Sequence, residues 1–146
     1  MKIALFGASG FVGSYILDSI IEKEFEPSVL VREGSENKLS QPEKCRIVTG
    51  DIQNEQAINE TINSADCIIY NIGIIRQFPK QGITFEELHF EGAKRTIDSA
   101  VKQNVKRFIL MSANGVRPKG TDYQRTKYKA EIYLKKTKLN WTIFRP

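Results

Sequence analysis

Residues that bind metals or build disulfide frameworks are scarce in this sequence. It contains one histidine, His89, and two cysteines, Cys45 and Cys67. A structural zinc site needs about four Cys or His ligands at short spacings, so no metal site is expected. Small secreted domains held by disulfides carry many more cysteines. We therefore expect reduced, partly buried thiols and a cytoplasmic protein.

Long apolar runs are also absent. None approaches the roughly 20 residues that an apolar helix needs to cross a bilayer. The apolar stretch at the N-terminus is interrupted by glycines at regular spacing and has no signal-peptide cleavage pattern. Internal repeats and low-complexity tracts are missing too. The sequence predicts no transmembrane segment and leaves association with a membrane-bound complex open.

The composition is that of an ordinary folded domain. The 146 residues are 40% hydrophobic and 27% charged, which fits a single globular core. With 22 Lys and Arg against 17 Asp and Glu, the formal net charge is +5. This excess suits nucleic acids, acidic membranes and phosphorylated cofactors alike. The Lys-rich segment 127–138 has its aromatics at core spacing, which favours a solvated helix face, so no nucleic-acid partner is expected.

Short β-rich runs alternate with longer segments of helical periodicity. This alternation predicts an α/β fold, a doubly wound parallel sheet in three α/β/α layers. Several strands are apolar without alternation, which is typical of strands buried on both faces. The predicted strands are 2–6, 28–32, 46–49, 67–71, 107–112 and 141–144. The predicted helices are 11–23, 55–63, 85–103 and 123–136, with loops at 34–43 and 76–82.

One motif joins the first predicted strand to the first predicted helix. It reads G-x-x-G-x-x-G, with the glycines at Gly7, Gly10 and Gly13. The first glycine permits the sharp turn, the second lets backbone amides approach a pyrophosphate, and the third allows close packing of helix on strand. Free N–H groups and the helix dipole favour the phosphate charge. Three packing glycines without a ligand are the alternative. The predicted phosphate site comprises Gly7, Ser9, Gly10, Phe11, Val12 and Gly13.

The motif resembles that of the extended and atypical short-chain dehydrogenases/reductases, which include nucleotide-sugar epimerases and NmrA-like proteins. The resemblance extends along nearly the whole chain and implies a Rossmann fold that binds NAD or NADP. Asp51 and Ile52, after the third predicted strand, are similar to the family's adenine-binding pair, although a surface turn is the alternative for Asp51. Asn71 and Gly73 are similar to the small-residue segment beside the cofactor's ribose.

The end of the second predicted strand indicates which dinucleotide is bound. NADP sites use an arginine near the 2′-phosphate, whereas NAD sites use an acidic side chain on the ribose diol. Arg32 lies where NADP-preferring relatives carry a basic residue, and Lys38 follows in the next loop. Glu33 would suit NAD instead, and a solvated strand-end charge is the alternative for Arg32. We predict NADP, with NAD as the second choice.

Tyr123 and Lys127 form a Y-x-x-x-K pair at the start of the last predicted helix, one turn apart on the same face. An ammonium at this spacing stabilises a phenolate, so the tyrosine can act as acid or base in hydride transfer. An amphipathic tyrosine and a solvated lysine on an ordinary helix are the alternative. The resemblance implies that Lys127 also binds the cofactor. The family's third catalytic position, a serine or threonine, is Ala113 here, so Ser112 completes the triad imperfectly. His89 is expected to hydrogen-bond rather than to catalyse.

With Ala113 and His89 at these positions, the sequence resembles most the atypical subgroup of the family. This subgroup includes the nicotinamide-binding accessory subunit of respiratory complex I. Two hypotheses stay open. One is a reductase or nucleotide-sugar epimerase-like oxidoreductase that uses NAD(P)(H). The other is a non-catalytic NADP(H)-binding sensor or accessory subunit, which Ala113 favours. We expect one dinucleotide-binding domain over residues 1–146, without the substrate-binding region that follows the Arg-Pro dipeptide in the family. The chain is then a minimal unit or a fragment, and its substrate and oligomeric state stay open.

Overall fold

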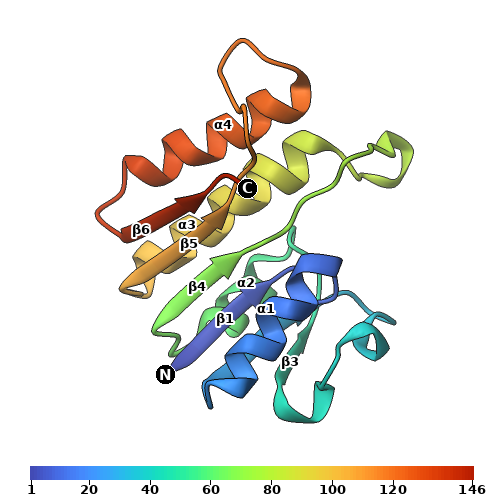
Figure 1. The fold of residues 1–146 in the computed structure, drawn as a ribbon, viewed down its shortest axis with the longest axis vertical. Helices are drawn as coiled ribbons and strands as arrows, with labels where there is room; N and C mark the ends of the chain where they lie inside the picture. Colours follow the sequence, from blue (N-terminus) through green and yellow to red (C-terminus); the bar gives the residue numbers. More distant parts are fainter.

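All six strands run parallel in one sheet, as the computed structural model of residues 1–146 shows (Figure 1). Their order across the sheet is β3-β2-β1-β4-β5-β6, which reverses between β1 and β4. At such a switch point the carboxyl ends of the strands open a crevice for ligands. The predicted parallel sheet is confirmed. The strands are β1 (Lys2–Phe6), β2 (Glu26–Val31), β3 (Arg46–Thr49), β4 (Cys67–Tyr70), β5 (Arg107–Met111) and β6 (Asn140–Phe144).

Helices cover both faces of the sheet, which confirms the three-layer arrangement. One face carries α1 (Phe11–Glu22), and the other carries α2 (Glu55–Ile62), α3 (Gly92–Lys102) and α4 (Asp122–Lys135) (Figure 1). Nearly all element ends lie within two residues of the predicted ones, a difference usual at the ends of helices and strands. The loops contain short 3-10 turns over Glu36–Lys38, Pro42–Lys44 and Pro79–Gln81. No helix has the length and apolar character that a membrane span requires.

Two apolar clusters hold the layers together. The larger one lies between the sheet and α2, α3 and α4, and it includes Phe6 and Phe108. The smaller one lies beneath α1 and includes Leu5 and Leu17. Leu5 and Phe6 point to opposite faces of β1 and neither is exposed, and burying each of these side chains contributes roughly 1.5–3 kcal/mol. Strand β1 is therefore a firm anchor for the glycine turn that follows it.

The helix predicted over residues 85–103 is present and unbroken to residue 102, but its first part is not α-helical, which corrects the prediction in that part. It begins with a π-helical turn over Glu86–Glu91 and continues as α3. The Tyr70 hydroxyl donates to the Leu88 carbonyl oxygen at 2.7 Å. A Cβ on Gly92 would lie 2.6 Å from the Tyr70 Oη, so only glycine fits above this tyrosine. The wide turn accommodates a side chain from β4, a contact that helical periodicity cannot reveal.

Candidate dinucleotide-binding site

The glycine turn leaves β1 at its carboxyl end and leads into α1. Gly7 has φ +93°, and a Cβ there would lie 2.9 Å from the Asn71 carbonyl carbon and oxygen. A Cβ on Gly13 would lie 1.9 Å from the Gly7 carbonyl oxygen. Both positions therefore exclude a side chain, because the backbone of the turn packs against α1 and against the loop after β4. Gly10 has room for a Cβ, whose nearest neighbour lies at 3.4 Å.

The N-terminus of α1 offers free backbone donors. The first N–H group to bond into the helix is that of Ser14, which donates to the Gly10 carbonyl at 2.9 Å. The N–H groups of Phe11, Val12 and Gly13 have no protein partner. No side chain caps this helix and its first turn contains no acid, whereas Thr121 caps α4. Exposed donors at the positive end of a helix suit an anion such as a diphosphate.

The residues predicted to contact the adenosine half follow β2 and β3. Arg32 is exposed, and none of the ion pairs in the structure involves it. Asp51 is exposed as well, and its Oδ1 accepts from the Gln53 N–H at 3.0 Å, as in a surface turn. Ile52 is 4% exposed and belongs to the larger core, so it anchors the turn that carries Asp51.

Lys127 belongs to α4, and its side chain reaches the segments at the carboxyl ends of β4 and β5. Its Nζ donates to the Met111 carbonyl at 3.1 Å and to the Ile72 carbonyl at 3.5 Å. A Cβ on Gly73 would lie 3.2 Å from the same Nζ, so the lysine rests directly on the segment from Asn71 to Gly73. The side chain is 5% exposed and has no carboxylate partner. Burial lowers the pKa of Lys127 to about 8.

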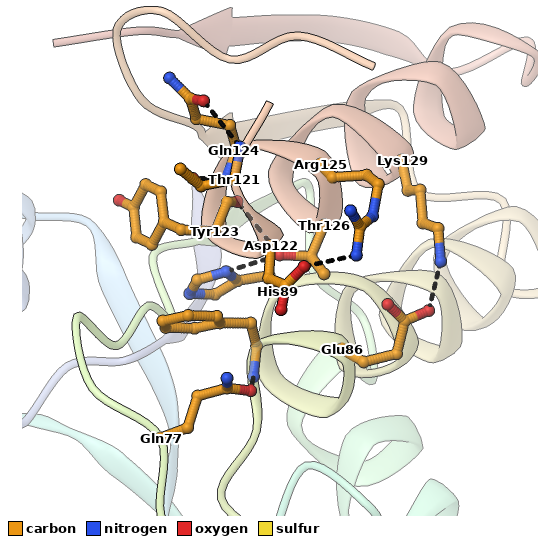
Figure 2. A network of polar contacts seen from close by, with 11 residues as sticks. Gln77, Glu86, His89, Thr121, Asp122, Tyr123, Gln124, Arg125, Thr126 and Lys129 are labelled. Atoms are coloured by element: carbon orange, nitrogen blue, oxygen red, sulfur yellow. Dashed lines mark hydrogen bonds and ion pairs between the residues drawn. The ribbon is translucent and has the colours of Figure 1, made fainter. Parts of the chain in front are cut away.

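Tyr123 begins the buried face of α4 (Figure 2). Its half-buried ring meets the rings of Phe85 and His89 edge-on, with centroids 5.6 Å and 5.0 Å away. Its hydroxyl forms no hydrogen bond within the protein, so it is available to a ligand. The helix brings Tyr123 and Lys127 to the same end of the sheet as the glycine turn, although they lie more than a hundred residues further along the chain.

Ser112 follows β5, but its hydroxyl has a partner of its own. Its Oγ donates to Oε1 of Glu131 at 2.5 Å. Glu131 is fully buried, and Arg145 donates to both of its carboxylate oxygens. Burial alone raises the pKa of Glu131, but hydrogen bonds from Arg145 and Ser112 outweigh it and hold the pKa below its ordinary value. Ser112 thus helps to hold a buried carboxylate.

Glu131 and Arg145 were not among the predicted site residues. A signal for Glu131 exists in the sequence, because Lys127, Ala130, Glu131 and Leu134 follow the spacing of one helix face, and all four are buried. A buried acid needs a cation or hydrogen-bond donors. Lys135, one helical turn further along α4, lies 3.9 Å from the carboxylate. The cation that hydrogen-bonds to it is Arg145, just after β6, and the sequence does not single out this residue.

His89 is 1% exposed and lies in the π-helical turn. Its Nε2 accepts from the Ile74 N–H at 3.1 Å, and its Nδ1 lies 3.0 Å from Oγ1 of Thr126. Burial, together with the charge of Lys127, lowers the pKa of His89 to about 3, so the ring is neutral. The predicted hydrogen-bonding role is confirmed.

The fold and the site define a class of protein: a Rossmann domain with a glycine turn at the switch point of its sheet. The chain belongs to the NAD(P)H-binding family, whose domain matches residues 7–146. This match confirms the predicted binding of a nicotinamide dinucleotide and does not distinguish NAD from NADP.

Known relatives place the chain among proteins of the short-chain dehydrogenase/reductase type, as predicted. It is 28% identical to the mitochondrial NADH-ubiquinone oxidoreductase 40 kDa subunit of Neurospora crassa, over 97% of this chain and 39% of that protein. It is 26% identical to the ceramide reductase of Caulobacter vibrioides, over 99% of this chain and 45% of that protein. The solved structure of the oxidoreductase ylbE from Lactococcus lactis has a TM-score of 0.78 and 26% identity, covering all of this chain and 68% of that chain. The chain spans less than half the length of both sequence relatives.

Proposed function

We propose that this chain forms the NADP(H)-binding part of a reductase in which Lys127 holds the nicotinamide ribose and Tyr123 exchanges the proton. The observation that carries the proposal is the Lys127 ammonium, which is buried without a carboxylate partner. Buried charges without partners are costly, and they are found where a ligand or a reaction needs them. The free α1 amides and the Gly73 backbone lie at the same end of the sheet, so one dinucleotide can reach both.

The bound cofactor supplies the hydride chemistry. The chain contributes binding and proton transfer. The α1 amides hold the diphosphate, and the Lys127 ammonium donates to a ribose hydroxyl while its positive charge favours a phenolate nearby. The Tyr123 hydroxyl, which has no protein partner, gives its proton to the oxygen of the substrate as that oxygen gains negative charge. Ser112 is left out of this scheme because its hydroxyl donates to Glu131.

The choice of NADP over NAD rests on Arg32. Its guanidinium is exposed and unpaired at the carboxyl end of β2, where it can meet a 2′-phosphate in a charge-assisted hydrogen bond. The neighbouring Glu33 is also exposed and unpaired, which keeps NAD as the second choice. Asp51 and Ile52 are proposed to border the adenine, and Asn71 the ribose.

Titration with NADPH and NADH, followed by nicotinamide fluorescence and by the thermal unfolding midpoint, tests the binding proposal. Saturable binding with tighter NADPH than NADH is expected. Gly10→Asp, which places a carboxylate beside the free amides at a position with room for a Cβ, should abolish binding. Ser19→Asp adds the same charge on an exposed position near the other end of α1 and should bind as the wild type does. Absence of binding by the wild-type protein would remove the proposal.

A second candidate is a non-catalytic NADP(H)-binding protein, and the Ser112–Glu131 hydrogen bond favours it. With Ala113 beside it, the site presents no free hydroxyl at the third catalytic position. NADPH oxidation with a panel of aldehydes and ketones separates the two candidates. A reductase should lose activity in Tyr123→Phe and keep it in Ser112→Ala. Tight NADPH binding without oxidation above background would favour the non-catalytic protein.

A further inference from the structure

His89 connects two segments that carry the site. Figure 2 shows its ring beside Thr126 and Tyr123 of α4, and the ring stacks on Phe85 with centroids 5.2 Å apart. On its other side, the ring accepts from the backbone N–H of Ile74, in the loop after β4. This histidine is the only one in the sequence. Through its contacts with Ile74 and Thr126, the His89 side chain joins the loop after β4 to the start of α4.

The partners determine which ring nitrogen carries the proton. A backbone N–H can only donate, so Nε2 accepts from Ile74 and carries no proton. The proton of the neutral ring is then on Nδ1 and is donated to Oγ1 of Thr126. The Thr126 hydroxyl in turn donates a hydrogen bond to the Tyr123 carbonyl oxygen at 3.1 Å. A doubly protonated ring would lose the Ile74 bond, so the connection requires neutral imidazole.

We propose that His89 is a positioning residue of the dinucleotide site: its neutral ring ties the backbone beside Gly73 to the first turns of α4 and thereby fixes Lys127 relative to the bound nicotinamide. A Cβ on Gly73 would lie 3.2 Å from Lys127 Nζ and 4.0 Å from His89 Nε2, so the three groups pack together. The Lys127 ammonium stays shielded from water only while the loop after β4 keeps its position. The role of the positioned lysine rests on the proposed function, whereas the positioning itself can be measured without a ligand.

The two ring nitrogens can be separated by substitution. Asparagine places an amide near the position of Nδ1, so His89→Asn keeps a donor for Thr126 and loses the acceptor for Ile74. Glutamine reaches the position of Nε2, so His89→Gln keeps the acceptor for Ile74 and loses the bond to Thr126. Thr126→Val removes the same bond from the α4 side with little change in shape. These variants form a matched set.

Nuclear magnetic resonance of the full chain without ligand tests the proposal. With a single histidine, the imidazole nitrogen spectrum reports His89 alone and should show the Nδ1–H tautomer unchanged from pH 5 to pH 8. Carbon-labelled lysine, with Lys127→Arg to identify the signal, should show Lys127 titrating near pH 8. In His89→Asn the released loop admits water, so the pKa of Lys127 should rise by about one unit, whereas His89→Gln should keep it within about 0.3 units.

The affinities for NADPH and for 2′,5′-ADP are a second measurement. A general loss of stability would not change one of them without the other. His89→Asn should weaken NADPH about tenfold and leave 2′,5′-ADP, which lacks the nicotinamide end, within about twofold of the wild type. An Nε2–H tautomer in the wild-type protein would overturn the proposal even if the variants do not fold. An unchanged Lys127 titration in folded His89→Asn would overturn it as well. If no variant or wild-type protein binds NADPH, the proposed function fails while the lysine titration still decides this inference.

Discussion

The glycine turn and the Tyr123–Lys127 side of the site differ in the atoms from which they are built. The turn offers free backbone N–H groups from consecutive residues, and its close packing excludes side chains at Gly7 and Gly13. The other side combines side chains of the π-helical turn and α4 with the backbone of the loop after β4, and the Lys127–Ile72 contact alone joins residues 55 positions apart. The first region needs only the absence of side chains, whereas the second depends on burial to set the properties of its lysine. Substitutions should therefore act on the turn through steric overlap and on the lysine side through solvation.

The largest effect should come from the turn. Gly13→Ala forces a Cβ into the Gly7 carbonyl oxygen, which would lie 1.9 Å away, so about 3 kcal/mol or more of unfolding free energy should be lost. Urea denaturation measures the loss. Gly10→Ala, whose Cβ meets only an ordinary contact, is the control and should lose less than about 1 kcal/mol. Equal losses in the two variants would mean that the turn does not pack as described.

Next in size is the pH dependence that burial of Lys127 creates. Its pKa falls from 10.5 to about 8 on folding. Between these values the unfolded chain binds more protons than the folded chain, so the free energy of unfolding rises with pH across this window; below it, the full cost of burying the ammonium is present. Relative to Lys127→Met, in which the other titrating groups cancel, the wild type should gain about 3 kcal/mol from neutral pH to beyond the window. If the free energy of unfolding changed equally with pH in the wild type and in Lys127→Met, the burial of the Lys127 ammonium would be contradicted.

A smaller loss should follow Ser112→Ala, which removes a hydrogen bond to the buried carboxylate of Glu131. A bond to a charged group in this setting contributes about 2 kcal/mol. Ser14→Ala, which removes a solvent-exposed hydrogen bond to the neutral Phe11 carbonyl, is the control and should change the free energy of unfolding by no more than about 0.5 kcal/mol. If Ser112→Ala left the free energy of unfolding unchanged but lowered the activity, Ser112 would have a catalytic role and not a structural one.

The smallest effect is expected at the end of β2. Arg32→Ala should weaken NADPH about tenfold, or about 1.4 kcal/mol, and leave NADH within about twofold, since only NADPH has the 2′-phosphate. Glu33→Ala should affect neither ligand by more than about twofold under this proposal. The opposite pattern, with NADH weakened by Glu33→Ala and no effect of Arg32→Ala, would assign the site to NAD.

Prediction from the sequence succeeded where the signal is local. The glycine spacing, the unbroken apolar β1 and the alternation of elements lie in short windows, and the parallel sheet follows from them. It found the helix over residues 85–103 but not the π-helical turn near its start, where the Tyr70 hydroxyl of β4 donates to the Leu88 carbonyl oxygen. It also missed Glu131 and Arg145, since the pairing of a buried acid with one cation among many is a tertiary contact.

By itself, the sequence determined the order of strands and helices and the turn that frees the α1 amides, because backbone geometry and apolar period act between near neighbours. Only the tertiary structure decided that Ser112 donates to Glu131, that His89 is neutral and joins two segments, and that the pKa of Lys127 is lowered. The physical reason is that hydrogen-bond partners and burial are properties of atoms brought together from distant parts of the chain. A side chain's charge state therefore becomes defined only once those parts have packed.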